Sequence, residues 1–213
     1  MMRMITSAAL PTAAAVLRVA GRPLPGNCRY MTAVTIPRPV AGDVVDLILD
    51  DHRLFEQLLR DLRDATADRE GARAALSAAL IAHGEAEEQD VYPALRRKDA
   101  IDKHEQEHGE EEHAEGNQAL LDLLECKGTD TQKFDDAVEK LAEALMHHIG
   151  EEEQTILNPA RTEVSEKVRQ DLGTAWATRR NALLDQDCGS IEFVKKVVAR
   201  AEKSGLLSSD DDK

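Results

Sequence analysis

The sequence predicts an all-α protein built as an up-down-up-down four-helix bundle with additional C-terminal helices. Three observations predict this fold class. Aromatic residues make up 3% of the chain while apolar residues make up 42%, a balance that favours close-packed helices over a sheet. From Asp43 onward, apolar residues recur at helical spacing. Four such segments follow one another with short connections, as in an antiparallel bundle.

The first two expected helices each carry an apolar stripe that also contains polar residues. The first helix follows Asp43, whose side chain suits an N-cap. The second runs from about Asp68 until Pro93 ends it. The first stripe consists of Val45, Leu49, His52, Leu59 and Leu62. The second consists of Leu76, Leu80, His83, Glu87 and Val91.

The third and fourth helices show the same mixture of apolar and polar positions. The third is expected to begin near Asp99 or Ile101. The fourth, capped by Asp130 or Thr131, should stop before Pro159. The third stripe consists of His113, Leu120, Leu123 and Leu124. The fourth consists of Leu141, Leu145, His148, Glu152 and Ile156.

The helical pattern divides the chain into a bundle and a C-terminal part. The bundle is expected over residues 43–160. Residues 161–207 show a weaker pattern, which predicts helices at about Ser165–Leu184 and Ile191–Lys203 that pack on the outside of the bundle. The closing residues 208–213, rich in Ser and Asp, are expected to form a disordered acidic tail.

Residues 1–42 differ in composition from the rest of the chain. They contain five arginines and no acidic residue, which is typical of an organelle transit peptide. The alternative, which we favour, is that translation begins at Met31 and the upstream residues are not structural. Under either interpretation, residues 1–42 are expected to be a disordered or non-structural extension.

An internal repeat relates the two halves of the expected bundle. The segment from His52 to Leu62 aligns with the segment from His113 to Leu123, including matched Gln, Leu and Asp positions. Likewise, His83-x-x-x-Glu87 aligns with His148-x-x-x-Glu152. The bundle is therefore expected to consist of two similar helical hairpins. Each provides one histidine from its first helix and a His-x-x-x-Glu pair from its second.

Four histidines and two glutamates thus lie on apolar stripes, and buried polar groups need partners. Any one of these histidines alone is more simply a core residue satisfied by a neighbour. Four on separate helices, two with a carboxylate four residues later, predict a metal site at one level of the bundle. Imidazole and carboxylate ligands suit iron, manganese or zinc, and two shared carboxylates suit a pair of metal ions. The predicted ligands are His52, His83, Glu87, His113, His148 and Glu152.

The other three histidines are expected at the surface. His147 shares its helix face with charged residues, and His104 and His108 point away from the stripe of His113. His104-Glu-Gln-Glu-His108 does fit the His-Glu-x-x-His pattern of zinc metalloproteases. That short match lies in a Glu-rich stretch with no evident third ligand. A ferritin-like di-iron site fits Glu110-x-x-His113 but fails on the fourth helix, which lacks Glu-x-x-His.

The complete motif set resembles the hemerythrin-like, HHE cation-binding family over roughly residues 43–160. The matching segments are Asp51-His52, His83-x-x-x-Glu87-Glu88 with Val91-Tyr92-Pro93, Glu112-His113, and His147-His148-x-x-Glu151-Glu152-Glu153. The resemblance implies a hemerythrin-like bundle that holds two iron ions in an oxo- or hydroxo-bridged, non-haem di-iron centre. By this resemblance the four stripe histidines would be terminal ligands. Glu87 and Glu152 would bridge the irons.

This sequence departs from oxygen-carrying hemerythrins in two ways. Those proteins have an additional histidine on the third helix and an Asp as the second carboxylate. Moreover, Pro159 lies eleven residues after His148, whereas Pro93 lies ten after His83. The end of the fourth helix is therefore expected to be distorted. The choice of His148 over His147 as the inward residue rests on the leucine stripe.

Composition and ligand count narrow the expected function. A net charge of −14 disfavours nucleic acid and anionic membranes as partners, and three scattered cysteines are typical of a reduced, cytoplasmic protein. With about five ligands per iron, each ion would keep a position open. We therefore expect a small diatomic or peroxide ligand, and a protein that binds or reduces O2, peroxide or nitric oxide, with catalase-like turnover left open.

Two alternatives to this function remain. One is an iron- or oxygen-responsive sensor whose C-terminal helices contact a protein partner or a second copy of the chain. The other is a plain helical bundle in which neighbouring side chains satisfy the histidines.

Overall fold

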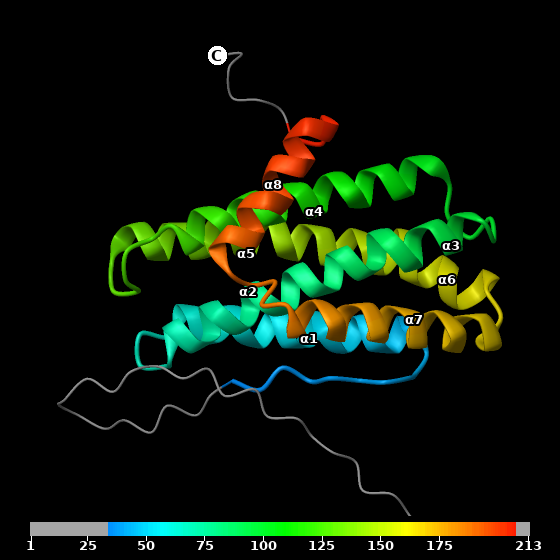
Figure 1. The fold of residues 1–213 in the computed structure, drawn as a ribbon, viewed down its shortest axis with the longest axis horizontal. Helices are drawn as coiled ribbons and strands as arrows, with labels where there is room; N and C mark the ends of the chain where they lie inside the picture. Colours follow the sequence, from blue (N-terminus) through cyan, green and yellow to red (C-terminus); the bar gives the residue numbers. More distant parts are fainter. Residues whose placement is uncertain (1–33, 208–213) are drawn as a thin grey trace, which may run out of the picture.

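Four long helices form two antiparallel hairpins in the computed structural model, which describes residues 34–207 (Figure 1). Helix α1 (Val44–Arg63) packs on α2 (Arg69–Ala86), and α4 (Lys103–Leu124) packs on α5 (Gln132–Glu152). Because α1 also contacts α5 and α2 contacts α4, the hairpins close into a bundle. The described residues contain no strand. The predicted all-α, up-down-up-down architecture is confirmed.

Side-chain caps fix where the long helices begin. Asp43, Asp68 and Thr131 each accept a backbone N–H of the first turn, as expected for N-caps. The third helix starts slightly later than predicted, after Asp102. The Asp102 side chain accepts the N–H groups of His104 and Glu105, and the Glu105 side chain closes a capping box.

The second helix does not end at Pro93, contrary to the prediction. The helical path continues through a π-helical turn, η1 (Glu87–Val91), into α3 (Tyr92–Arg96), which contains the proline. Proline lacks an N–H and its ring crowds the preceding helical turn. The wider π turn, with its i to i+5 bonding, lies directly before the proline and accommodates it.

The fourth helix passes its proline in the same way. After α5, the π turn η2 (Glu153–Leu157) leads into α6 (Asn158–Glu163), so the helix extends past Pro159 and past the boundary expected at residue 160. The end of this helix is distorted, as predicted. Relative to its histidine, η2 begins one residue later than η1. This offset absorbs the extra residue before Pro159 and leaves His148 and Glu152 on a regular α-helical turn.

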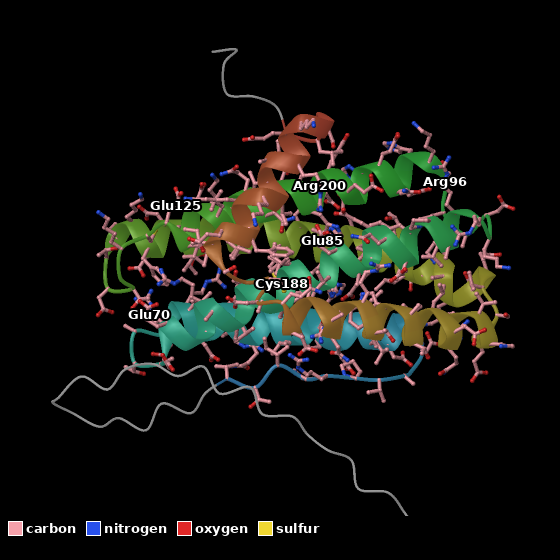
Figure 2. All side chains as sticks on the ribbon, viewed as in Figure 1. Glu70, Glu85, Arg96, Glu125, Cys188 and Arg200 are labelled. Carbon is pink, nitrogen blue, oxygen red and sulfur yellow. The ribbon has the colours of Figure 1, made fainter. Side chains whose placement is uncertain are left out.

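Two further helices cover the bundle (Figure 1). Helix α7 (Glu166–Asp185) packs along α1 and α2, and α8 (Ile191–Ser204) packs on α4. Both agree with the expected C-terminal helices. An ion pair between Arg200 of α8 and Glu85 of α2 joins α8 to the bundle, and Figure 2 shows the two residues facing each other.

The connection between α7 and α8 lies close against α2. Cys188 in this connection is fully buried, and its thiol donates to the Ala78 carbonyl at 3.4 Å. Burial raises the pKa of the Cys188 thiol to about 12, which keeps it protonated. Cys126 is also buried and free, whereas Cys28 lies outside the described residues. No helix in residues 34–207 is long and apolar enough to cross a membrane.

Residues 34–42 are ordered, which corrects the expectation that the whole 1–42 extension lacks structure. They lie along α7, where Arg180 donates to the Pro37 carbonyl at 2.9 Å and Asn181 to the Pro39 carbonyl at 2.7 Å. The expectations about a transit peptide, the Met31 start and the tail 208–213 concern residues outside the described range.

Candidate metal centre

All six predicted ligands meet in one buried layer of the bundle. Large apolar clusters lie on either side of this layer, one toward the hairpin loops and the other around α3, α6 and α7. Each of the six residues is at most 6% exposed. The histidines come one from each long helix, and the two glutamates lie where the second helix of each hairpin passes into its π turn. The six are His52, His83, Glu87, His113, His148 and Glu152.

Glu87 connects the two hairpins within this layer. Its Oε1 lies 3.1 Å from His83 Nε2, and its Oε2 lies 3.4 Å from His113 Nε2. One carboxylate therefore directs one oxygen to a histidine of each hairpin. This is the arrangement required of a carboxylate shared by two metal ions.

Glu152, at the end of α5, enters the same layer from the other hairpin. Its Oε2 is 3.1 Å from His52 Nε2 and 3.7 Å from His148 Nε2. Its Oε1 accepts a hydrogen bond of 2.9 Å from the Tyr92 hydroxyl. Tyr92 comes from α3, so the helical segment beyond η1 contributes directly to the centre.

Four outer carboxylates hold the imidazoles with Nε2 facing inward. Each contacts one Nδ1, at 3.0 to 3.3 Å. A carboxylate accepts a hydrogen bond, so Nδ1 carries the proton and Nε2 can bind a metal. The pairs are Asp51 with His83, Glu88 with His113, Glu112 with His148, and Glu153 with His52.

Most of the inward-facing atoms have no hydrogen-bond partner. They include Nε2 of His52, His83 and His148, both oxygens of Glu87 and Oε2 of Glu152. Each unsatisfied buried group costs about 1–3 kcal/mol. Ligands held at about 2.0–2.2 Å from one ion lie roughly 3–3.5 Å apart, close to the distances observed here. The residues therefore fit bound metal ions better than a plain bundle with satisfied histidines.

Close carboxylates change the pKa values of the imidazoles. Burial alone would lower the pKa of His113, but Glu87 and Glu88 together outweigh burial and raise this pKa well above its usual value. Burial likewise opposes the raised pKa of His52, which Glu152 brings about. Burial beside His113 lowers the pKa of His148. In the metal-free chain, protons on His52 and His113 thus compensate the buried carboxylates.

Helix α7 reaches this centre through one buried arginine. Arg180 is fully buried and binds both oxygens of Asp51, at 2.6 and 2.7 Å. Asp51 in turn orients His83. The ring of Trp176, also on α7, lies edge-on to His83 with ring centroids 5.8 Å apart.

The sequence interpretation missed Arg180 and Tyr92. Tyr92 appeared only as part of the family motif, without a role. One signal for Arg180 was available, because Trp176 precedes it by four residues and the two share a helix face. That face is apolar, and an arginine there requires a buried acidic partner.

The structure separates the remaining histidines from the centre as expected. The side chain of His147 is 64% exposed, whereas that of His148 is 5% exposed. The inward orientation predicted for His148 is thus observed, while its role as a ligand remains a prediction. His104 is exposed. His108 lies near two glutamates, Glu112 and Glu151, in a group that could hold a metal ion, and His104 is not part of this group. The His-Glu-x-x-His interpretation gains no support.

Replacing Arg180 by Met should leave Asp51 buried without its guanidinium partner. We expect the free energy of unfolding to fall by about 3–5 kcal/mol, and metal affinity to fall roughly 10- to 100-fold because His83 loses its orienting group. The matched control is Arg179→Met, which removes the partly exposed ion pair with Asp90 and should cost at most about 1 kcal/mol. Urea denaturation and metal titration measure both effects; equal losses in the two variants would contradict this role.

Metal binding should release protons from His52 and His113. Both pKa values are raised in the folded, metal-free chain, and a ligand imidazole must be neutral. Apparent metal affinity should therefore increase with pH, and metal binding should release protons. Calorimetric titration in buffers of different ionisation enthalpy counts these protons, and His113→Ala should reduce the number while His104→Ala should not.

The same pKa shifts set the stability of the metal-free chain. Stabilisation by imidazoles with raised pKa values is fully present below their unfolded pKa of about 6.5. It is lost as the pH rises through the folded values. Metal-free protein should accordingly become less stable above pH 6.5. Two results together would count against protonated His52 and His113. One is a heat of metal binding that does not depend on the buffer, and the other is a free energy of unfolding that does not change with pH.

Comparison with known proteins agrees with this geometry. The hemerythrin HHE cation binding domain model matches residues 43–159, a range that contains all six inward residues and the four outer carboxylates. Searches of curated proteins and of solved structures give no match. The match covers more than half of the chain, and the chain belongs to the hemerythrin HHE cation-binding domain family.

Proposed function

We propose that this chain is a non-haem di-iron protein that binds or reduces O2, peroxide or nitric oxide. The observation that carries the proposal is the position of Glu87, whose two oxygens face histidines of different hairpins. The histidines are paired within hairpins, with ring centroids of His52 and His83 5.3 Å apart and those of His113 and His148 4.5 Å apart. Two ions, one at each pair, would share the carboxylates between them.

The donor set supports iron and an open position on each ion. Two imidazoles and the shared carboxylates supply fewer than the six ligands of an octahedral ion, and this mixture of nitrogen and oxygen suits iron. When bound, iron would supply a redox-active Lewis acid to a small ligand. The protein's own contribution is to keep the site buried and the ligands oriented.

A narrow cavity beside the centre supports a ligand of very small size. It has a volume of about 20 Å³ and borders His113 and His148, and its other walls are mainly apolar or small residues. This volume holds roughly one water-sized molecule. Gly84 contributes to the opening, because a Cβ there would lie 3.3 Å from His113 Nδ1. The cavity does not border Glu87 or Glu152, so it supports an approach path for O2, nitric oxide or peroxide, and it is too narrow for larger substrates.

Tyr92 places a proton next to the centre. Its buried hydroxyl donates to Glu152 and lies 3.5 Å from His113 Nε2. Burial and the charge of Glu152 raise the Tyr92 pKa well above 10. The phenol therefore stays protonated at neutral pH, and its one hydrogen can turn from Glu152 to a group that arrives beside this carboxylate.

Iron content and peroxide consumption test the proposal. Protein purified in air should contain about two irons per chain and absorb in the near ultraviolet. His113→Ala should lower the iron content, whereas a mere core histidine would lower only stability, and His104→Ala serves as the surface control. Iron-dependent disappearance of peroxide would demonstrate turnover. A colourless protein with one zinc per chain would refute the di-iron assignment.

The contact between α7 and the centre favours a second candidate function, an iron- or oxygen-responsive sensor. A change at His83 can reach α7 through Asp51 and Arg180, all of which are buried. Helix α7 would then respond to the metal state and contact a protein partner.

Hydrogen exchange of α7 with and without iron tests the sensor. Amides of α7 should be better protected in the iron-bound chain, because iron fixes His83 and thereby Asp51 and Arg180. Arg180→Met should remove the difference while the chain stays folded. Identical protection of α7 in both metal states would exclude this function without affecting the di-iron assignment.

A further inference from the structure

A second group of histidines and glutamates lies on the rim between α4 and α5, outside the buried centre. Helix α4 contributes His108 and Glu112, and α5 contributes His147 and Glu151. On each helix the two residues are four positions apart, so their side chains share one face. We call these four residues the rim cluster.

The rim cluster repeats the His-x-x-x-Glu spacing of the buried centre, and its donor atoms converge. His108 Nε2 lies 2.9 Å from Glu151 Oε2, and His147 Nε2 lies 3.4 Å from Glu151 Oε1. Glu112 Oε1 lies 3.6 Å from His147 Nε2 and 3.9 Å from His108 Nε2. Ligands about 2.0–2.2 Å from one tetrahedral ion are roughly 3.3–3.5 Å apart. Donor atoms of His108, Glu112 and Glu151 lie within 4.8 Å of one another, so these three need only a small approach to bind one ion. His147, on the exposed side, contacts the other oxygen of Glu151 and can complete the set by turning inward.

Glu112 provides an independent sign of a missing cation. Its side chain is 8% exposed, and its Oε1 is buried without a hydrogen-bond partner. The distances of 3.6 and 3.9 Å to the two rim imidazoles are too long for hydrogen bonds. If the cluster were only a set of surface ion pairs, this buried oxygen would remain unsatisfied.

The internal repeat gives a second reason to expect positive charge here. Asp51 precedes His52 as Glu112 precedes His113, and both carboxylates orient a histidine of their own hairpin. The outer side of Asp51 is bound by the guanidinium of Arg180. At the corresponding side of Glu112 the structure has the two rim imidazoles.

We propose that His108, Glu112, His147 and Glu151 bind one divalent transition-metal ion, with Zn²⁺ the best fit. Two imidazole nitrogens and two carboxylates form a four-coordinate donor set that zinc accepts, whereas Ca²⁺ and Mg²⁺ prefer oxygen ligands alone. Three of the four side chains are 42 to 64% exposed, so the ion can exchange with solvent. This site does not depend on which metal occupies the buried centre.

Metal analysis after dialysis against Zn²⁺ tests the rim site. The iron-loaded chain is equilibrated with micromolar Zn²⁺, and zinc and iron are measured per chain. The wild-type chain should take up one zinc more than the double variant His108→Ala, His147→Ala. His104→Ala, which removes an exposed histidine of α4 outside the rim cluster, should retain this zinc.

Iron content controls for effects on the buried centre. It should be the same in the wild type and the double variant, because neither substitution touches a buried ligand. Glu151→Gln, which keeps the side-chain shape, should weaken zinc binding at least ~10-fold. Equal zinc uptake by the wild type and the double variant would overturn the proposal, and so would a wild-type chain that takes up no zinc. Neither outcome would bear on the di-iron assignment.

Discussion

The burial of two carboxylates in the middle of a helical bundle is the constraint on which the rest of this structure depends. Glu87 and Glu152 are at most 1% exposed, and an uncompensated buried charge costs several kcal/mol. Positive charge must therefore be present at their level, either as protons on His52 and His113 or as metal ions. Folding and cation binding are consequently two aspects of one charge balance. This explains why the polar layer can lie between two apolar clusters.

The outer carboxylates connect this balance to the helix pairing. Glu88 follows Glu87 in the sequence but orients His113 of the other hairpin, and Glu153 likewise orients His52. Successive helical residues point about 100° apart, so the neighbour of an inward residue faces an adjacent helix. Because two of these bonds cross between hairpins, the inward direction of Nε2 depends on correct assembly of the whole bundle. Of each tandem pair of acidic residues in the motif, one faces the buried layer and the other orients a histidine across it.

Helical periodicity was sufficient to predict the buried layer, because a single step along a helix turns a side chain by about 100° and distinguishes His148 from His147. Local capping chemistry likewise predicted Asp43 as an N-cap and left Asp130 or Thr131 for the fourth helix, of which Thr131 is the N-cap. Periodicity could not predict the passage of the helices through Pro93 and Pro159, since a π turn changes the period itself. The order of residues 34–42 and the role of Arg180 depend on contacts between distant segments, which no local pattern contains.

Charges alternate outward from the centre, and this alternation explains why the outer helix is part of the site. The partly exposed outer carboxylates Glu88 and Glu153, at 24 and 29% side-chain exposure, can be solvated by water. The two more buried ones, Asp51 and Glu112, cannot. Arg180 from α7 compensates Asp51, which a four-helix bundle alone would leave unpaired. Glu112 has instead the two imidazoles of the rim cluster, with which it can share a metal ion. Asp51 and Glu112, the equivalent positions of the repeat, are therefore compensated in different ways. Asp51 has the permanent charge of Arg180, whereas the rim imidazoles beside Glu112 are partly exposed to solvent.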